Sequence, residues 1–376
     1  MDRHELRRLD YSLSPDHQAL QGAYREFFAA HCPIEVVRSA EESGFDKSLW
    51  ERLCAMGATT MAVPESAGGD GATLVDLTLV AEEIGRVVAP VPWIDHVCAA
   101  RLLGRLGALD ADIVSGRQLV SFDPGQENRP GAKLIPSGSI ADHVLVRDGE
   151  QIVRLTYGIR PEKVENIGRL PMAWVDPEAA DTRAVVARGA TACAEYQRAL
   201  DEWRLLTAAA LAGLVEATMT IAAEFAKTRF TLGVPIASLQ AISHPLANIA
   251  IIVQSGRNLA RRAAWFLDNE PDARAELAPA AFVFMADEAP RAATMAVHVQ
   301  GGLGVSDEAA ATAYLVRARG WALAAGDPGA SAKRIGEILA AREGRLGERS
   351  DGKGRWGERS DGKGRWGERS DGKGRN

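Results

Sequence analysis

Apolar residues recur at helical spacing through the first third of the chain. A run that follows Ser14-Pro15 carries them every three or four positions, at Ala19, Leu20, Ala23, Phe27 and Phe28. This spacing lines one face of an α-helix, and a serine followed by proline is typical of a helix start. A second run of the same kind extends from Leu74 to Val87. The pattern therefore predicts a helical domain over residues 1–117.

The pattern changes near residue 118. Short runs rich in β-branched and apolar residues follow, separated by Gly, Pro and Asp, at Leu119–Phe122, Val144–Val146 and Ala184–Val186. They predict a small β-domain over residues 118–195. From residue 196 the chain is rich in Ala and Leu at helical spacing, with few helix breakers, which favours four or five long helices packed as a bundle over residues 196–345. The expected fold class is α+β.

The last thirty residues are of a different kind. The sequence Gly-Glu-Arg-Ser-Asp-Gly-Lys-Gly-Arg-Trp occurs twice from Gly347, and a third copy ends in Asn376. Each copy carries three positive and two negative charges and at most one large apolar residue, too little to offset the entropy of ordering. We expect a disordered tail over residues 346–376. A basic tail that touches RNA or lipid through Trp356 and Trp366 is the alternative, and a net charge of only +1 per copy disfavours it.

Composition and charge exclude several classes of protein. Of the 376 residues 46% are hydrophobic and 25% are charged, as in ordinary globular proteins, and the net charge of −6 argues against a nucleic-acid partner. We expect neither a signal sequence nor a membrane span, because the chain begins with charged residues and has no uninterrupted apolar run of about 18 residues. A cytoplasmic protein is expected. The four cysteines lack C-x-x-C spacing, which predicts no metal site and no disulfides: Cys32, Cys54, Cys98 and Cys193.

Four segments carry recognisable motifs. They are Val63-Pro-Glu-Ser-Ala-Gly-Gly-Asp-Gly71, Ala81-Glu-Glu-Ile-Gly-Arg86, Arg229-Phe-Thr-Leu-Gly-Val-Pro-Ile-Ala-Ser-Leu-Gln240 and His298-Val-Gln-Gly-Gly-Leu-Gly304. In this order and at these separations they resemble the acyl-CoA dehydrogenase family, over nearly all of residues 12–343. The resemblance implies an N-terminal helical domain, a middle β-domain, a C-terminal four-helix bundle and FAD as the cofactor.

The resemblance also implies which residues contact FAD. Arg229 would hold the pyrophosphate, because a guanidinium group fits phosphate oxygens through two contacts. Gln240 would hydrogen-bond near the adenosine end. The glycines Gly301, Gly302 and Gly304 would let the backbone approach the dinucleotide closely. His298 stands where the family commonly has glutamine, and His244 lies on the helical face of Gln240. Taken one at a time, these residues have simpler explanations: Arg229 as a solvated helix end, Gln240 as a surface amide and the glycines as a helix C-cap.

The catalytic base of the family is missing from its two usual positions. The family removes the α-proton of a CoA thioester with a glutamate. Counted along the chain, one position for that glutamate falls at Ala325-Gly326 and the other at Trp203. The neighbouring Asp201 and Glu202 are rotated away by roughly 100° per residue of helix. Asp327 is a possible substitute, although a helix cap before Pro328 is the simpler role. We therefore assign no catalytic residue to this chain.

Residues that contact the flavin ring in the family are also missing from this sequence. The T-E-P-x-x-G-S-D stretch of the family corresponds to residues 122–130, which lack its glycine-serine and acidic positions. The K-x-W-I-T/S-N stretch corresponds to residues 131–142, which offer Leu134 and Pro136 in place of ring contacts. The motifs thus retain the contacts that the family donates across a subunit interface and lose those around the ring.

These observations lead to one hypothesis and three alternatives. We expect a subunit of a heteromeric acyl-CoA dehydrogenase, similar to actinobacterial α2β2 enzymes that act on steroid side-chain CoA thioesters. A companion subunit would supply the glutamate, and acyl-CoA would be the substrate. The alternatives are a self-sufficient homo-oligomer that uses Asp327 or an unrecognised carboxylate, a flavin-dependent oxygenase or oxidase on the same fold, and a purely structural partner.

Overall fold

The computed structural model describes residues 10–125, 131–306 and 308–351. The N-terminal part is helical, as predicted. Ser14 caps the first long helix, where its Oγ accepts a hydrogen bond from the backbone N–H of His17 at 3.2 Å. Its elements are α2 (Pro15–His31), α3 (Ile34–Ser39), α4 (Lys47–Ala55), η1 (Thr60–Ala62), η2 (Glu65–Ala67), α5 (Leu74–Arg86), α6 (Trp93–Arg105) and α7 (Ala111–Val114).

The middle of the chain forms a small β-domain. A four-stranded sheet has the order β1 (Val120–Phe122), β3 (His143–Asp148), β4 (Gln151–Thr156) and β6 (Thr182–Arg188), with only β1 and β3 parallel. β2 (Lys133–Ile135) pairs antiparallel with β5 (Ala173–Val175). Buried aliphatic residues such as Val144, Val153 and Leu155 form a separate core under these strands. The three predicted strand segments coincide with β1, β3 and β6.

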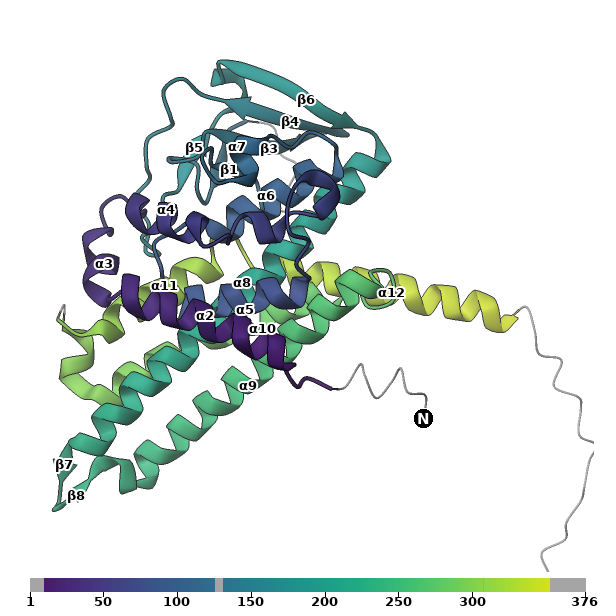
Figure 1. Ribbon diagram of the computed structural model, residues 1–376. Coiled ribbons are helices and arrows are strands. Elements are labelled where there is room, and N and C mark those ends of the chain that lie inside the picture. The colour runs from purple at the N-terminus through teal and green to yellow at the C-terminus, as the bar shows by residue number, and fades with distance from the viewer. Residues whose placement is uncertain (1–9, 126–130, 307, 352–376) are drawn as a thin grey trace, which may run out of the picture.

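The C-terminal part is a layered bundle of helices. It contains α8 (Ala190–Thr228), α9 (Gln240–Asn269), α10 (Leu277–Gln300), α11 (Ala310–Ala322) and α12 (Gly329–Asp351). The short hairpin β7 (Phe230–Thr231) and β8 (Val234–Pro235) joins α8 to η4 (Ile236–Ser238) and α9, and η5 (Gly301–Val305) follows α10. Figure 1 shows the β-domain at one end of the helical layers, and both figures show α12 projecting away from the body.

The domain limits differ by a few residues from the predicted ones. α8 begins at Ala190, so it includes residues that the strand pattern placed in the β-domain. α12 continues to Asp351 and therefore includes residues 346–351, which we expected in the disordered tail. A helix that is already formed gains one hydrogen bond for each residue added, so it can extend into a sequence of low apolar content. Residues 352–376 of the predicted tail lie outside the described residues.

α8 is the central helix of the protein. It is long and apolar enough to span a membrane by length and composition, with a mean hydropathy of 1.7 over its most apolar stretch, but 78% of that stretch is buried inside the protein. α8 packs against α5, α6, α9, α10 and α11. Its apolar character is therefore explained by a position in the core of the helical layers.

Two glycines allow α5 and α8 to cross closely. A Cβ atom added at Gly85 would lie 1.8 Å from the carbonyl oxygen of Ala210, and one at Gly213 would lie 1.9 Å from that of Glu82. No other residue fits at this crossing. The Glu-Glu-x-Gly-Arg motif of α5 thus has a structural role, and its Arg86 also pairs with Glu83 at 2.8 Å.

Candidate functional site

The first predicted cofactor segment lies at the far end of α8. Arg229 caps this helix through its backbone N–H, which donates to the carbonyl of Phe225 at 2.9 Å. Its side chain is exposed, and the guanidinium has no hydrogen bond or ion pair with the described residues. The hairpin that follows turns through Leu232 and Gly233, both with positive φ. Gln240 is exposed at the first position of α9.

The second segment lies at the end of α10. His298 is exposed in the last turn, and Gly301 ends the helix with φ 61°. A Cβ added at Gly301 or Gly302 would meet no described atom within 4 Å, so a ligand has room to approach this backbone. Gly304 is different, because a Cβ there would lie 2.7 Å from the carbonyl oxygen of Val297. Packing within the chain accounts for a glycine at that position.

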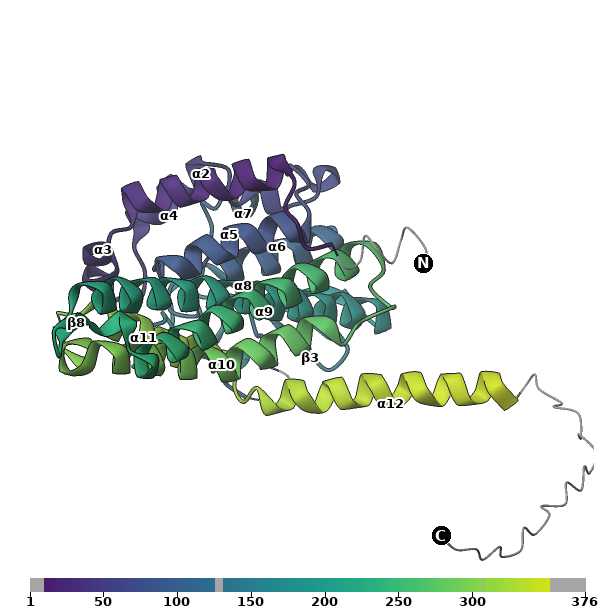
Figure 2. The same cartoon turned by 90° about the horizontal axis from the view of Figure 1, so that it is seen from below.

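Both segments lie at the same end of the helical layers, as the two views in Figures 1 and 2 agree. Large apolar side chains are exposed among the predicted cofactor residues. Leu232 at the tip of the hairpin is 91% exposed. Its exposed neighbours are Phe230 and Val234 in the hairpin, and Leu303 and Val305 in η5. An unpaired arginine, accessible backbone and apolar groups thus share one outward surface, which we call the cofactor end.

A cavity of about 70 Å³ lies between the N-terminal helices, the β-domain and the bundle. Trp203 of α8 and Ala324, next to Ala325, both line it. The two positions that we expected for the family's glutamate therefore lie at or beside one cavity, although they are more than a hundred residues apart in sequence. Ligand pockets usually measure about 300 Å³ or more. The indole of Trp203 lines a space much smaller than a flavin ring and an acyl chain require.

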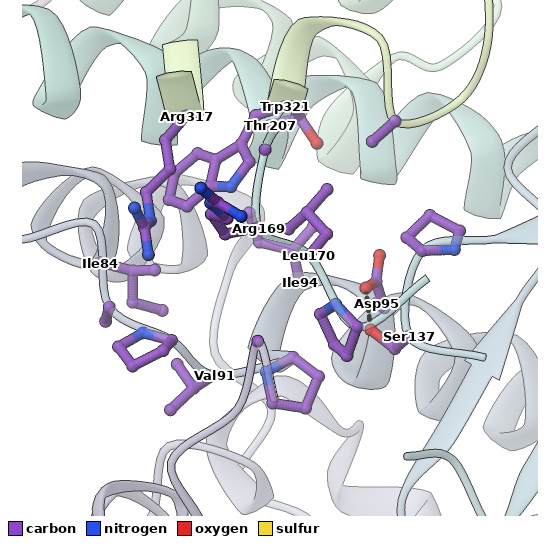
Figure 3. A pocket seen from close by; sticks show the side chains of 18 of the residues that line it. Ile84, Val91, Ile94, Asp95, Ser137, Arg169, Leu170, Thr207, Arg317 and Trp321 are labelled. Atoms are coloured by element: carbon purple, nitrogen blue, oxygen red, sulfur yellow. Dashed lines mark hydrogen bonds between the residues drawn. The ribbon is translucent and has the colours of Figure 1, made fainter. Parts of the chain in front are cut away.

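One carboxylate lines this cavity, and sequence reasoning did not single it out. Asp95 of α6 accepts hydrogen bonds from Trp203 Nε1 at 2.8 Å and from the hydroxyl of Ser137 (Figure 3). Burial raises the pKa of Asp95, and the two hydrogen bonds act in the opposite direction. The signal in the sequence was an acidic residue inside the apolar stretch from Ala89 to Ala100.

The other acidic candidates are engaged elsewhere. Asp201 pairs with Arg204 at 2.6 Å, and Glu202 with Arg105 at 2.9 Å. Asp327 is exposed and accepts a hydrogen bond from the backbone N–H of Gly329 at 2.8 Å, which makes it the cap of α12. None of the three lines the cavity. The helix-cap role that the sequence suggested for Asp327 agrees with this contact.

The ring-contact segments lie beside the cavity without forming a larger pocket. Pro136 lines the cavity directly after β2, whereas Leu134 in that strand is paired opposite Trp174 of β5. Trp174 is an aromatic residue that the motif comparison missed, but it is 56% exposed and does not line the cavity. Residues 126–130 of the other segment lie outside the described residues. Within the described ranges no group of metal-ligating side chains is found.

Comparison with known proteins identifies the family. A family model described as the N-terminal domain of acyl-CoA dehydrogenase matches residues 14–109, and one described as the C-terminal domain matches residues 194–339. Acyl-CoA dehydrogenase IpdE2 of Mycolicibacterium smegmatis is 27% identical and covers 86% of this chain and 98% of its own length. IpdE2 of Mycobacterium tuberculosis is 29% identical and covers 81% of this chain and 91% of its own.

Solved structures show the same fold. A variant of the Tcur3481-Tcur3483 steroid ACAD has a TM-score of 0.78 and 26% identity, and the ChsE4-ChsE5 complex from Mycobacterium tuberculosis has a TM-score of 0.74 and 27% identity. Each covers 88% of this chain and 99% of its own. Butyryl-CoA dehydrogenase from Megasphaera elsdenii shares the fold at a TM-score of 0.78 and 21% identity. The chain belongs to the acyl-CoA dehydrogenase family, a family of FAD-dependent oxidoreductases.

Proposed function

We propose that this chain is the base-lacking subunit of a heteromeric acyl-CoA dehydrogenase. It contributes Arg229, Gln240 and the loop from His298 to Gly302 to an FAD whose ring lies in a companion subunit. That companion would supply the glutamate that removes the α-proton of the thioester, and the FAD held between the two chains would supply the hydride acceptor for the β-hydrogen. The residues of this chain bind and orient the cofactor and take no part in proton transfer.

The observation that carries the proposal is the separation of the two regions along α8. Arg229 follows Trp203 by twenty-six residues in the same unbroken helix, a rise of roughly 39 Å at 1.5 Å per residue. No arginine side chain reaches across that distance. An FAD held by Arg229 would therefore lie outside this chain's own cavity, which supports placing that cofactor in a neighbouring subunit.

The cofactor end fits this role. The guanidinium of Arg229 has no partner within the described residues, and the backbone at Gly301 and Gly302 is accessible. Both could therefore donate hydrogen bonds to anionic phosphates without breaking an existing contact. The exposed side chains of Leu232, Phe230 and Val305 supply apolar surface that a second subunit would cover.

Two relatives point to the kind of assembly. The solved structures of Tcur3481-Tcur3483 and of ChsE4-ChsE5 each pair two different chains, and the first is described as a steroid ACAD. By analogy with them we assign a companion acyl-CoA dehydrogenase chain as the partner and the CoA thioester of a steroid-derived acid as the substrate.

The test is an Arg229→Ala substitution in the complex of this chain with its companion. Loss of a charge-assisted contact worth about 2 kcal/mol should weaken FAD retention roughly thirtyfold. The control is Arg183→Ala on β6, an exposed arginine remote from the cofactor end. FAD content is measured by absorbance after gel filtration. Unchanged flavin content and rate in Arg229→Ala would leave this chain a structural partner only.

A second experiment addresses the companion. The isolated chain should bind little FAD and show no dehydrogenation, whereas the complex should hold one flavin for each pair of unlike chains. Full flavin occupancy in the isolated homo-oligomer would contradict the proposal. Asp327→Asn should leave the rate of the complex unchanged, because Asp327 caps α12.

One observation favours the self-sufficient alternative, namely the carboxylate of Asp95 in the cavity. If the isolated chain binds flavin and turns over acyl-CoA, and if Asp95→Asn abolishes turnover while flavin stays bound, the base is Asp95 and the enzyme is homo-oligomeric. Oxygen consumption by the isolated chain would instead identify an oxidase or oxygenase.

A further inference from the structure

The charged side chains around the cavity form two groups. Figure 3 shows the guanidinium groups of Arg169 and Arg317 on one side and Asp95 with Ser137 on the other. Asp95 is satisfied by its hydrogen bonds from Ser137 and Trp203. Arg169 and Arg317 make no such short side-chain hydrogen bonds with the described residues. The packing of the fold therefore does not explain why these two charged groups line the cavity.

Arg317 of α11 is buried with only 3% of its side chain exposed. Its Nη1 atom has no hydrogen-bond partner, and the nearest carboxylate, that of Glu41, is 3.8 Å away. Burial lowers the pKa of Arg317, and the charge of Arg169 acts in the same direction. A buried guanidinium without hydrogen bonds is costly, so an anion brought to it would be strongly favoured.

Arg169 is held beside the same space by close packing of its loop. Its backbone has a positive φ of 54°, which is unusual for a residue other than glycine. The loop is pressed against α11, where a Cβ at Gly320 would lie 2.0 Å from the Cα of Gly168, and a Cβ at Gly44 would lie 2.8 Å from the carbonyl oxygen of Arg169. The side chain of Arg169 is 44% exposed, and its ion pair with Glu165 is 3.8 Å long. A second cation is therefore fixed at the entrance.

The rest of the cavity wall near the arginines is apolar. Leu170, Ile84 and Trp321 line it together with several prolines. A volume of about 70 Å³ is several times the roughly 10–15 Å³ that one water molecule needs. The space thus accepts a small group with one anionic end, and its walls favour carbon over additional polar atoms.

We propose that this cavity binds a small aliphatic monocarboxylate, of roughly two to four carbon atoms. The carboxylate accepts hydrogen bonds from Arg317 and Arg169, and its short apolar body lies against Leu170 and Trp321. This site is distinct from the proposed flavin contacts, because Trp203 in its wall lies roughly 39 Å along α8 from Arg229. The bound acid is a ligand of this chain whether or not a companion subunit is present.

The test uses the full-length chain without added flavin and propionate as the probe, titrated by isothermal calorimetry. Saturable binding is expected at one site, with propan-1-ol and inorganic phosphate each binding at least about tenfold more weakly, since one lacks the charge and the other the apolar body. Arg317→Gln and Arg169→Gln should each weaken propionate binding about tenfold or more. Arg183→Gln is the matched control and should bind as the parent does.

Several outcomes would overturn the proposal. Absence of saturable binding, equal binding of propan-1-ol or phosphate, or unchanged affinity in both arginine variants would each exclude a carboxylate site of this kind. If Arg317→Gln does not fold, Arg169→Gln decides alone, since that side chain is partly exposed. None of these results bears on the flavin content of the complex, so the two proposals fail separately.

Discussion

His96 of α6 is a buried histidine whose surroundings fix its protonation state. Its Nε2 lies 3.1 Å from the carbonyl oxygen of Ile113, and its Nδ1 accepts a hydrogen bond from the backbone N–H of Val120 at 3.3 Å. Nε2 must therefore carry the proton. A second proton on Nδ1 would face the N–H of Val120. Burial accordingly lowers the pKa of His96 from 6.5 to about 4.

This predicts a loss of stability in weak acid. In the unfolded chain the imidazole of His96 takes up a proton near pH 6.5, whereas in the folded chain it does so only near pH 4. His96 therefore has no effect on stability above pH 6.5, but it lowers the free energy of unfolding by about 3 kcal/mol at pH 4. Urea unfolding between pH 7 and pH 4 should therefore show a smaller decline in His96→Gln than in the parent chain. His244→Gln, at an exposed position, should behave as the parent.

Single residues show what sequence could and could not predict. Motif spacing led from Arg229 to Trp203 and from Gly301 to Ala325, and the structure places Trp203 and Ala324, the neighbour of Ala325, in the wall of one cavity. It missed Asp95 and Arg317, because which side chains meet in a cavity depends on the crossing of α6, α8 and α11 rather than on any local pattern. It could not distinguish Gly304, packed on Val297, from the accessible Gly301 and Gly302.

Helices α6 and α8 are joined by a buried cluster of charges. Glu202 is fully buried and contacts Arg101 at 3.2 Å and Arg105 at 2.9 Å. Burial alone would raise the pKa of Glu202, but the two arginines outweigh it and lower the pKa to about 2. The stabilisation from this carboxylate is complete above pH 4.5 and is lost as the pH falls toward 2.

Glu202→Gln should therefore destabilise the protein at neutral pH. Arg101 would lose its carboxylate partner in the interior and Arg105 one of two, which costs roughly 3–5 kcal/mol. The matched change is Glu195→Gln, which removes a partly exposed partner of Arg105 and should cost only about 1 kcal/mol. Chemical denaturation at pH 7 measures both, and equal losses would contradict the assigned role of burial.

Alanine substitutions at two glycines, one at the crossing of α5 and α8 and one with open space around it, should change the stability in opposite directions. Gly85→Ala places a methyl group on the carbonyl of Ala210 and should cost roughly 1–3 kcal/mol by overpacking. Gly22 in α2 has open space at the corresponding position, so Gly22→Ala should stabilise by about 1 kcal/mol through helix propensity. Thermal unfolding that shifts in the same direction for both variants would refute the close crossing.

Element types followed from the hydrophobic pattern because packing in layers demands a regular apolar face. The limits of the elements did not follow. The extension of α12 to Asp351 reflects helix propagation into sequence of low apolar content, whereas the early start of α8 buries Ala192 and Tyr196 on one helical face. The exposed β7–β8 hairpin likewise has no core-facing pattern, and only the motif around Arg229 marked it as important.

At the scale of the molecule, the repeat tail should be dispensable. Residues 352–376 contain Trp356 and Trp366 as their only large apolar residues, so they offer folding little surface to bury. Removing them should leave the melting temperature and the flavin content of the complex unchanged, as measured by calorimetry and absorbance. A drop of several degrees would show that the tail binds the folded body or the companion.

The length of α8 has a consequence for how this protein changes over generations. Its 39 residues form a rod of roughly 58 Å, with Trp203 of the cavity in its N-terminal half and Arg229 directly after its last residue. The roughly 39 Å between these two residues means that a substitution at the cavity makes no contact with Arg229. If Arg229 serves a neighbouring chain as proposed, a duplicated gene can lose the chemistry of its own cavity and still keep the arginine that its neighbour needs.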